Sequence, residues 1–173
     1  MGNHQSAAAP IQERRSDTKP KAVKQALQQY QNALVSVEML QARLELYDEK
    51  SRAAPTANLD GMPHGKGIAP DQTAHFAQLV LDTLDRLDAA QAAAETARAK
   101  VEGLIYSILP DSPTAIRKIS VLELRYLDGL KWPDVSRGLF GTAEDFEERT
   151  ESYLRRTTAL HQDAIAELSK KLK

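Results

Sequence analysis

The chain has 173 residues, a formal net charge of −1 at pH 7, 5% aromatic residues and no cysteine, which fits one domain with an extension. The lack of cysteine excludes disulfides and thiolate metal sites and is compatible with the cytosol. Because there is no run of about twenty apolar residues and no apolar signal-peptide core, we expect a soluble, cytoplasmic protein that does not enter a membrane.

Two long amphipathic helices are predicted in the first two thirds of the chain. Residues 1–19 have no apolar periodicity and are expected to form a disordered tail. Two apolar stripes with three- and four-residue steps then predict an antiparallel, coiled-coil-like helical hairpin over residues 20–109. The first stripe comprises Val23, Leu27, Tyr30, Leu34, Val37, Leu40, Leu44 and Tyr47. The second comprises Phe76, Leu79, Thr83, Leu87, Ala90, Ala94, Ala97, Val101, Leu104 and Ile108.

A Pro- and Gly-rich loop is predicted between the two helices, over residues 51–70. Such a long connection either carries a function, for example docking a partner, or is a flexible turn. Its Gly65-Lys66-Gly67 is not a phosphate-binding loop, because the glycine spacing, the following Ser or Thr and the preceding strand are missing.

Alanines at Ala90, Ala94 and Ala97 make the seam of this hairpin thin. Small side chains bury little apolar area, so the hairpin needs further partners to complete its core. We expect it either to self-associate or to fold against the C-terminal helices, and a homodimer is the preferred interpretation.

A short amphipathic helix is predicted after residue 111. Ser112 suits its N-cap, and Pro113 suits the first helical position, where no N–H is needed. Gly129 can take the left-handed conformation that ends a helix, so the chain is expected to turn before Lys131. The apolar face of this helix comprises Ile116, Ile119, Leu122 and Tyr126.

A second, shorter helix is predicted from Trp132 to Phe140, with Pro133 in its first turn and Gly141 after its end. A helix of about two turns is not stable alone and must pack between two others. This pattern is typical of a helix-turn-helix unit whose last helix enters the major groove, and we assign it to residues 110–173. Its predicted core is Leu122, Tyr126, Trp132, Val135 and Leu139.

The segment LELRYLDGL at 122–130, followed by Trp132, Val135, Leu139 and Gly141, resembles region 4 of bacterial sigma factors. It is similar to the phage-encoded, sigma-region-4-like late-gene activators of the ArpU/RinA type, which pair N-terminal helices with such a helix-turn-helix. DGMPHGKG at 60–67 resembles their glycine loop, and SYLRR and LHQDAIAEL resemble their final helix. The resemblance covers roughly residues 20–172 and implies a transcriptional regulator in the bacterial cytoplasm that binds promoter DNA or contacts host RNA polymerase.

An acidic insertion, residues 142–151, departs from the sigma pattern. Because acidic side chains repel phosphate, it is expected to form a loop or an extra helical turn held off the DNA. The recognition surface is then expected from about Thr150 onward, since Arg, Ser and Thr can reach phosphates or base edges. The candidate DNA-contacting residues are Lys131, Arg149, Thr150, Ser152, Arg155, Arg156, Thr157 and His161, with Gln162 as an alternative to His161.

Other interpretations of these residues stay open. Arg155 and Arg156 could lie on a solvated helix face, and His161 could be a packing residue. The nearly balanced charge of residues 116–173 predicts modest DNA affinity, which a dimer or a polymerase contact would offset. The alternatives to a regulator are a small terminase-like DNA-packaging subunit, which would form a closed ring, and a helical interaction module that does not bind DNA.

No enzymatic activity is predicted. The four histidines, His4, His64, His75 and His161, form none of the spaced pairs typical of metal sites. No nucleophile motif of the Gly-x-Ser-x-Gly type occurs. We therefore expect neither a metal nor a cofactor.

Overall fold

The structure, a computed structural model, describes residues 18–53 and 72–171. Their regular structure is entirely helical, which confirms the predicted fold class. The elements are α2 (Thr18–Ala53), α3 (Gln72–Ile105), α4 (Pro113–Leu122), the π-helix η1 (Glu123–Leu127), α5 (Trp132–Phe140) and α6 (Thr150–Lys171). The predicted tail up to residue 17 and nearly all of the predicted loop, residues 54–70, lie outside the described residues.

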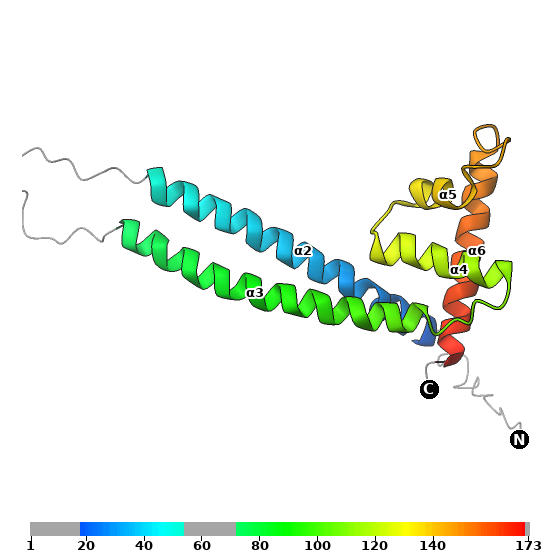
Figure 1. The fold of residues 1–173 in the computed structure, drawn as a ribbon, viewed down its shortest axis with the longest axis horizontal. Helices are drawn as coiled ribbons and strands as arrows, with labels where there is room; N and C mark the ends of the chain where they lie inside the picture. Colours follow the sequence, from blue (N-terminus) through cyan, green and yellow to red (C-terminus); the bar gives the residue numbers. More distant parts are fainter. Residues whose placement is uncertain (1–17, 54–71, 172–173) are drawn as a thin grey trace, which may run out of the picture. The chain divides into compact units, whose positions relative to one another are not determined.

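The helices α2 and α3 form the predicted hairpin. Figure 1 shows them running side by side in opposite directions. Every residue of the two predicted stripes is buried or half-buried, as expected if the stripes form the contact between the helices. None of the helices in the described ranges is long and apolar enough to cross a lipid bilayer.

The described residues form two compact units. Unit 1 contains residues 18–31 and 98–171, and unit 2 contains residues 32–97 of the hairpin. The predicted boundary between residues 109 and 110 therefore does not separate the units, because one end of each hairpin helix belongs with the C-terminal helices.

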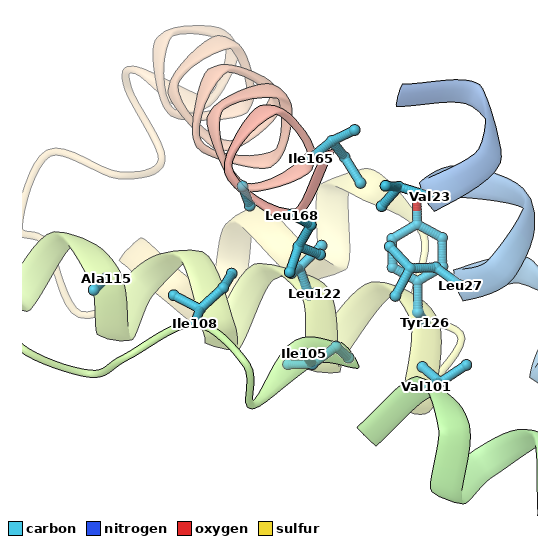
Figure 2. Packing of buried hydrophobic residues seen from close by; sticks show 11 residues of the cluster. Val23, Leu27, Val101, Ile105, Ile108, Ala115, Leu122, Tyr126, Ile165 and Leu168 are labelled. Atoms are coloured by element: carbon cyan, nitrogen blue, oxygen red, sulfur yellow. The ribbon is translucent and has the colours of Figure 1, made fainter. Parts of the chain in front are cut away.

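The core of unit 1 explains this division. Figure 2 shows side chains of this core converging, among them Val23 and Leu27 of α2 and Val101 and Ile105 of α3. Burying an aliphatic side chain of this size stabilises a fold by about 1.5–3 kcal/mol. Of the two ways to complete the core of the hairpin, folding against the C-terminal helices is thus the one found in unit 1. The remaining members of the cluster are Ile108, Ala115, Leu122, Tyr126, Ala164, Ile165 and Leu168.

The start of α4 follows the sequence signals. The Ser112 hydroxyl accepts a hydrogen bond from the Ala115 backbone N–H at 3.1 Å, and Pro113 opens the helix. Farther along, the half-buried ammonium of Lys118 pairs with Glu167 of α6 at 3.1 Å. The N-cap and this ion pair fix where α4 begins and how it meets α6.

Gly129 ends the α4–η1 helix, as predicted. It has a φ of +70°, and no other described residue has a positive φ. The amide of Gln31, on α2, donates a hydrogen bond to the Tyr126 carbonyl at 2.9 Å and so covers the end of the helix. A Cβ at position 129 would lie 3.0 Å from the side-chain oxygen of Gln31.

We expect the substitution Gly129→Ala to lower the free energy of unfolding by about 1–2 kcal/mol, because an L-residue is strained at positive φ. Gly103→Ala is the matched control, since Gly103 lies inside α3 and its added Cβ would meet no atom within 4 Å. That change should raise stability by about 0.5–1 kcal/mol. Urea unfolding followed by circular dichroism checks both values, and equal shifts in the two variants would contradict this account.

Candidate nucleic-acid interface

The short helix α5 and the long helix α6 form the candidate interface within unit 1. Pro133 lies in the first turn of α5, and the helix ends at Phe140 before Gly141, as predicted. Val135 is fully buried, whereas Trp132 and Leu139 are half-buried. Because α6 packs against both α4 and α5, these shorter helices support it (Figure 1).

An aromatic cluster fixes the start of α6. The Tyr153 ring lies 5.2 Å from the Phe140 ring and 5.5 Å from the Phe146 ring, measured between centroids. The guanidinium of Arg156 lies 5.0 Å from the centre of the Phe140 ring, a cation–π arrangement. Phe146 is 3% exposed although it sits within the acidic insertion, so its side chain anchors the insertion to the fold.

Asp145 holds the acidic insertion to α6. Its carboxylate accepts hydrogen bonds from the Tyr153 hydroxyl at 2.6 Å and from Arg149 at 3.1 Å. These two hydrogen bonds keep the pKa of Asp145 below its ordinary value, and the hydrogen bond from Tyr153 has the larger effect. The insertion is a run of tight turns that ends where α6 begins at Thr150, in agreement with the prediction of a loop or extra turn.

The exposed face of α6 carries two of the predicted arginines. Ser152, Arg155, Arg156, Ala159 and Gln162 are all exposed, and their spacing places them along about three turns of the helix. Arg155 lies 3.5 Å from Glu151, with both side chains more than four-fifths exposed. Such a solvated pair is weak, so the guanidinium of Arg155 is available to another anion.

Three further predicted residues are also exposed. Lys131 is exposed and precedes the first residue of α5. Arg149 is exposed and paired with Asp145. Thr150 is exposed at the start of α6, where its hydroxyl donates to the Phe146 carbonyl at 3.1 Å.

Two of the predicted DNA-contacting residues are buried, and this corrects the prediction. Thr157 is 0% exposed and its hydroxyl donates to the Tyr153 carbonyl, while His161 is 6% exposed. Neither side chain can reach a phosphate or a base from there. The sequence does contain the signal for this, because Thr157 and His161 continue the buried stripe of Ala164, Ile165 and Leu168 at helical spacing.

His161 is a packing residue that joins α6 to the other C-terminal helices. Its Nε2 is 2.9 Å from the Tyr126 hydroxyl, and its ring meets the Trp132 ring edge-on at 4.9 Å. The guanidinium of Arg125 covers the Trp132 ring at 5.1 Å and donates to the Leu130 carbonyl. Trp132 is therefore held between a histidine and an arginine, as a structural residue.

The environment of His161 disfavours its charged form. Burial, with smaller contributions from Lys24 and Arg125, lowers the pKa of His161 from 6.5 to about 4. In the unfolded chain the ring binds a proton near pH 6.5, whereas in the folded chain it stays neutral down to about pH 4. The contribution of the neutral His161 ring to the stability of the folded chain is therefore complete above pH 6.5, and it is lost as the pH falls from 6.5 towards 4.

We expect the free energy of unfolding to fall by about 1.5 kcal/mol between pH 7 and pH 5 because of His161 alone. Urea unfolding at the two pH values measures this loss. In the variant His161→Gln, which keeps a polar side chain but does not titrate, the loss should be smaller by that amount. The same pH dependence in both proteins would contradict the assignment.

Acidic side chains border the exposed arginines. Glu147, Glu148 and Glu151 line a shallow hollow of about 490 Å³ together with Arg149 and Arg155. A polyanion binding here would meet both signs of charge, so its affinity would be modest at physiological salt. No group of three His, Asp or Glu residues suited to a metal ion occurs within residues 18–53 and 72–171.

Sequence reasoning missed the residues that organise this region. Phe146, Asp145 and Gln31 were not predicted to have a structural role, yet each fixes a turn or a helix end. The one available signal was Phe146, an aromatic residue within an acidic run. No protein-family model, no curated protein sequence and no solved structure matches this chain.

Proposed function

We propose that the protein is a DNA-binding transcriptional regulator of the sigma-region-4-like type that its sequence resembles, and that the exposed face of α6 contacts duplex DNA. The observation that carries the proposal is a long helix supported by two shorter ones. Its N-terminal half exposes Ser152, Arg155 and Arg156. Helix-turn-helix proteins place such a helix in the major groove.

The arginine and glutamine side chains on this face suit the chemistry of DNA. Arg155 and Arg156 can each bind phosphate oxygens or the O6 and N7 atoms of guanine, and Gln162 can bind adenine. Ala159 lies between them and is small enough to let the helix come close to the bases. Lys131 and Arg149 would add phosphate contacts at the edge of the groove.

Self-association belongs to this proposal. The acidic residues near α6 limit the affinity of one copy for DNA, and a dimer that binds two half-sites gains from the high effective concentration of its second copy. We propose that the hairpin forms this homodimer. A contact with host RNA polymerase, as in the family that the sequence resembles, would also strengthen binding to promoter DNA.

Selection from a pool of random duplexes tests the proposal. The full-length chain should enrich a shared sequence, and the logarithm of its binding constant should fall linearly with the logarithm of salt concentration. If no duplex is enriched at low salt, the proposal is wrong. A closed ring of many subunits by light scattering would instead favour a small terminase-like packaging subunit.

The acidic hollow beside Arg155 favours a second candidate function, a protein-interaction module that binds a basic partner. The variant Glu151→Gln separates the two functions, because Glu151 is exposed and contacts Arg155. It should tighten DNA binding by removing a repulsive charge and freeing the arginine. For a module that binds a basic protein, the same change should weaken partner binding.

A further inference from the structure

The outer face of α2 in unit 2 is apolar and has no partner within the described residues. Val35, Met39 and Leu46 are 52%, 64% and 45% exposed. With Ala42, which is also exposed, they recur at steps of four, three and four residues. By helix geometry they lie on the side of α2 opposite to the stripe that packs on α3. Such spacing is that of a coiled-coil seam.

Charged residues flank this seam in a regular order. Glu38 and Glu45 lie along one edge and Arg43 and Lys50 lie along the other, with a step of seven residues within each pair. All four side chains are exposed, and none takes part in an ion pair within residues 18–53 and 72–171. Acidic and basic edges on one helix are complementary to the edges of an identical helix.

The orientation of the second helix follows from these charges. In a parallel, in-register pair, the residue on one edge of the seam faces the residue about five positions later on the other edge of its partner. Glu38 of one copy then faces Arg43 of the second copy, and Glu45 faces Lys50. Two-fold symmetry doubles both pairs. In an antiparallel pair the acidic edge of one copy would face the acidic edge of the other, and the two basic edges would also face each other.

We propose that a second copy of this chain binds along Val35–Leu46, parallel and in register, through the seam of Val35, Met39, Ala42 and Leu46. This inference rests on the dimer of the proposed function and deepens it by naming its surface and orientation. Because α3 already supports α2 as a helix, the two copies associate without the entropy loss of folding the helix. The small side chain of Ala42, near the middle of the seam, lets the two helices approach closely.

Cysteine cross-linking tests the orientation, since the chain contains no cysteine of its own. Val35→Cys and Leu46→Cys are made as separate variants and oxidised without DNA. In a parallel, in-register dimer each variant cross-links with its own kind, because equivalent seam positions lie within disulfide distance. The control is Leu81→Cys, at an exposed apolar position on α3, which should stay monomeric on a non-reducing gel.

Cross-linking only in a mixture of the two seam variants would show an antiparallel pair and overturn the proposal. Cross-linking of Leu81→Cys alone would place the interface elsewhere and would also overturn it. Because DNA is absent from this experiment, either of these results would overturn the proposed dimer without bearing on the proposed DNA binding by α6.

A charge exchange gives an independent test by light scattering. The double variant Glu38→Lys/Glu45→Lys should shift the protein from dimer to monomer, because all four edge positions then carry positive charge. Adding Arg43→Glu and Lys50→Glu to the same chain should restore the dimer. A double variant that stays dimeric, or a fourfold variant that stays monomeric while circular dichroism shows full helicity, would overturn the proposal.

Discussion

The double variant Arg155→Ala/Arg156→Ala is expected to bind a selected duplex at least about 30-fold more weakly than the natural chain. Each lost charge-assisted contact to a base edge or phosphate removes on the order of 1–3 kcal/mol. If both side chains contact phosphates, the salt dependence of the binding constant should also fall by about two units. Fluorescence anisotropy at several salt concentrations measures both quantities.

Lys100→Ala/Lys170→Ala is the matched control for this experiment. Both lysines are exposed in unit 1, and removing them changes the net charge by the same amount. The control should lose much less affinity, because Lys100 lies on α3 and Lys170 lies about two turns beyond Gln162 on α6, outside the proposed contact face. Equal losses in the two double variants would mean that only overall charge matters and that Arg155 and Arg156 have no special role. Circular dichroism of both variants establishes that they are folded.

Leu122→Ala is expected to lower the free energy of unfolding by about 3 kcal/mol, within the range seen for buried leucines. Leu122 is 0% exposed and lies in the core cluster with residues from the start of α2, the end of α3 and α6. The substitution removes buried methyl groups and leaves a cavity that fixed helices cannot close. Urea unfolding followed by circular dichroism gives the change in free energy.

Ile116→Ala is the control for the core, because Ile116 lies on the same helix but is 52% exposed. This substitution should lower the free energy of unfolding by less than about 1 kcal/mol, because little buried apolar area is removed. If Ile116→Ala destabilises the protein as much as Leu122→Ala does, the arrangement of α4 described above is wrong.

Local sequence signals were sufficient to predict the helices and most of their ends. Ser112 and Gly129 mark helix ends through the N-cap and the positive φ, for which their residue types are strongly preferred. The two stripes of the hairpin are strict enough to predict which sides of α2 and α3 become buried.

Contacts between distant parts of the chain could not be predicted in this way. Gln31 binds the Tyr126 carbonyl across 95 residues, and no local pattern marks either partner. For the same reason the division into units was missed, because it depends on Val23 and Val101 meeting the C-terminal helices.

The error in the candidate interface has a different cause. Thr157 and His161 were assigned to DNA by residue type, since hydroxyl and imidazole groups often bind nucleic acids. Their helical phase was the better guide, because it places them on the buried side of α6 with Ile165. Ser152 and Arg155 have the opposite phase and are exposed. Residue type shows what a side chain can bind, and helical phase shows whether it is accessible.

Photo-cross-linking from the exposed face of α6 tests the central claim most directly. Benzoylphenylalanine is placed at Ala159, between Arg155 and Gln162, and in a separate variant at Ala99, an exposed position on α3. With a selected duplex, irradiation should link DNA to the variant carrying the probe at Ala159 and leave the Ala99 variant free. Cross-links from Ala99 alone, or none from Ala159 while the duplex is bound, would contradict the proposal that α6 contacts DNA.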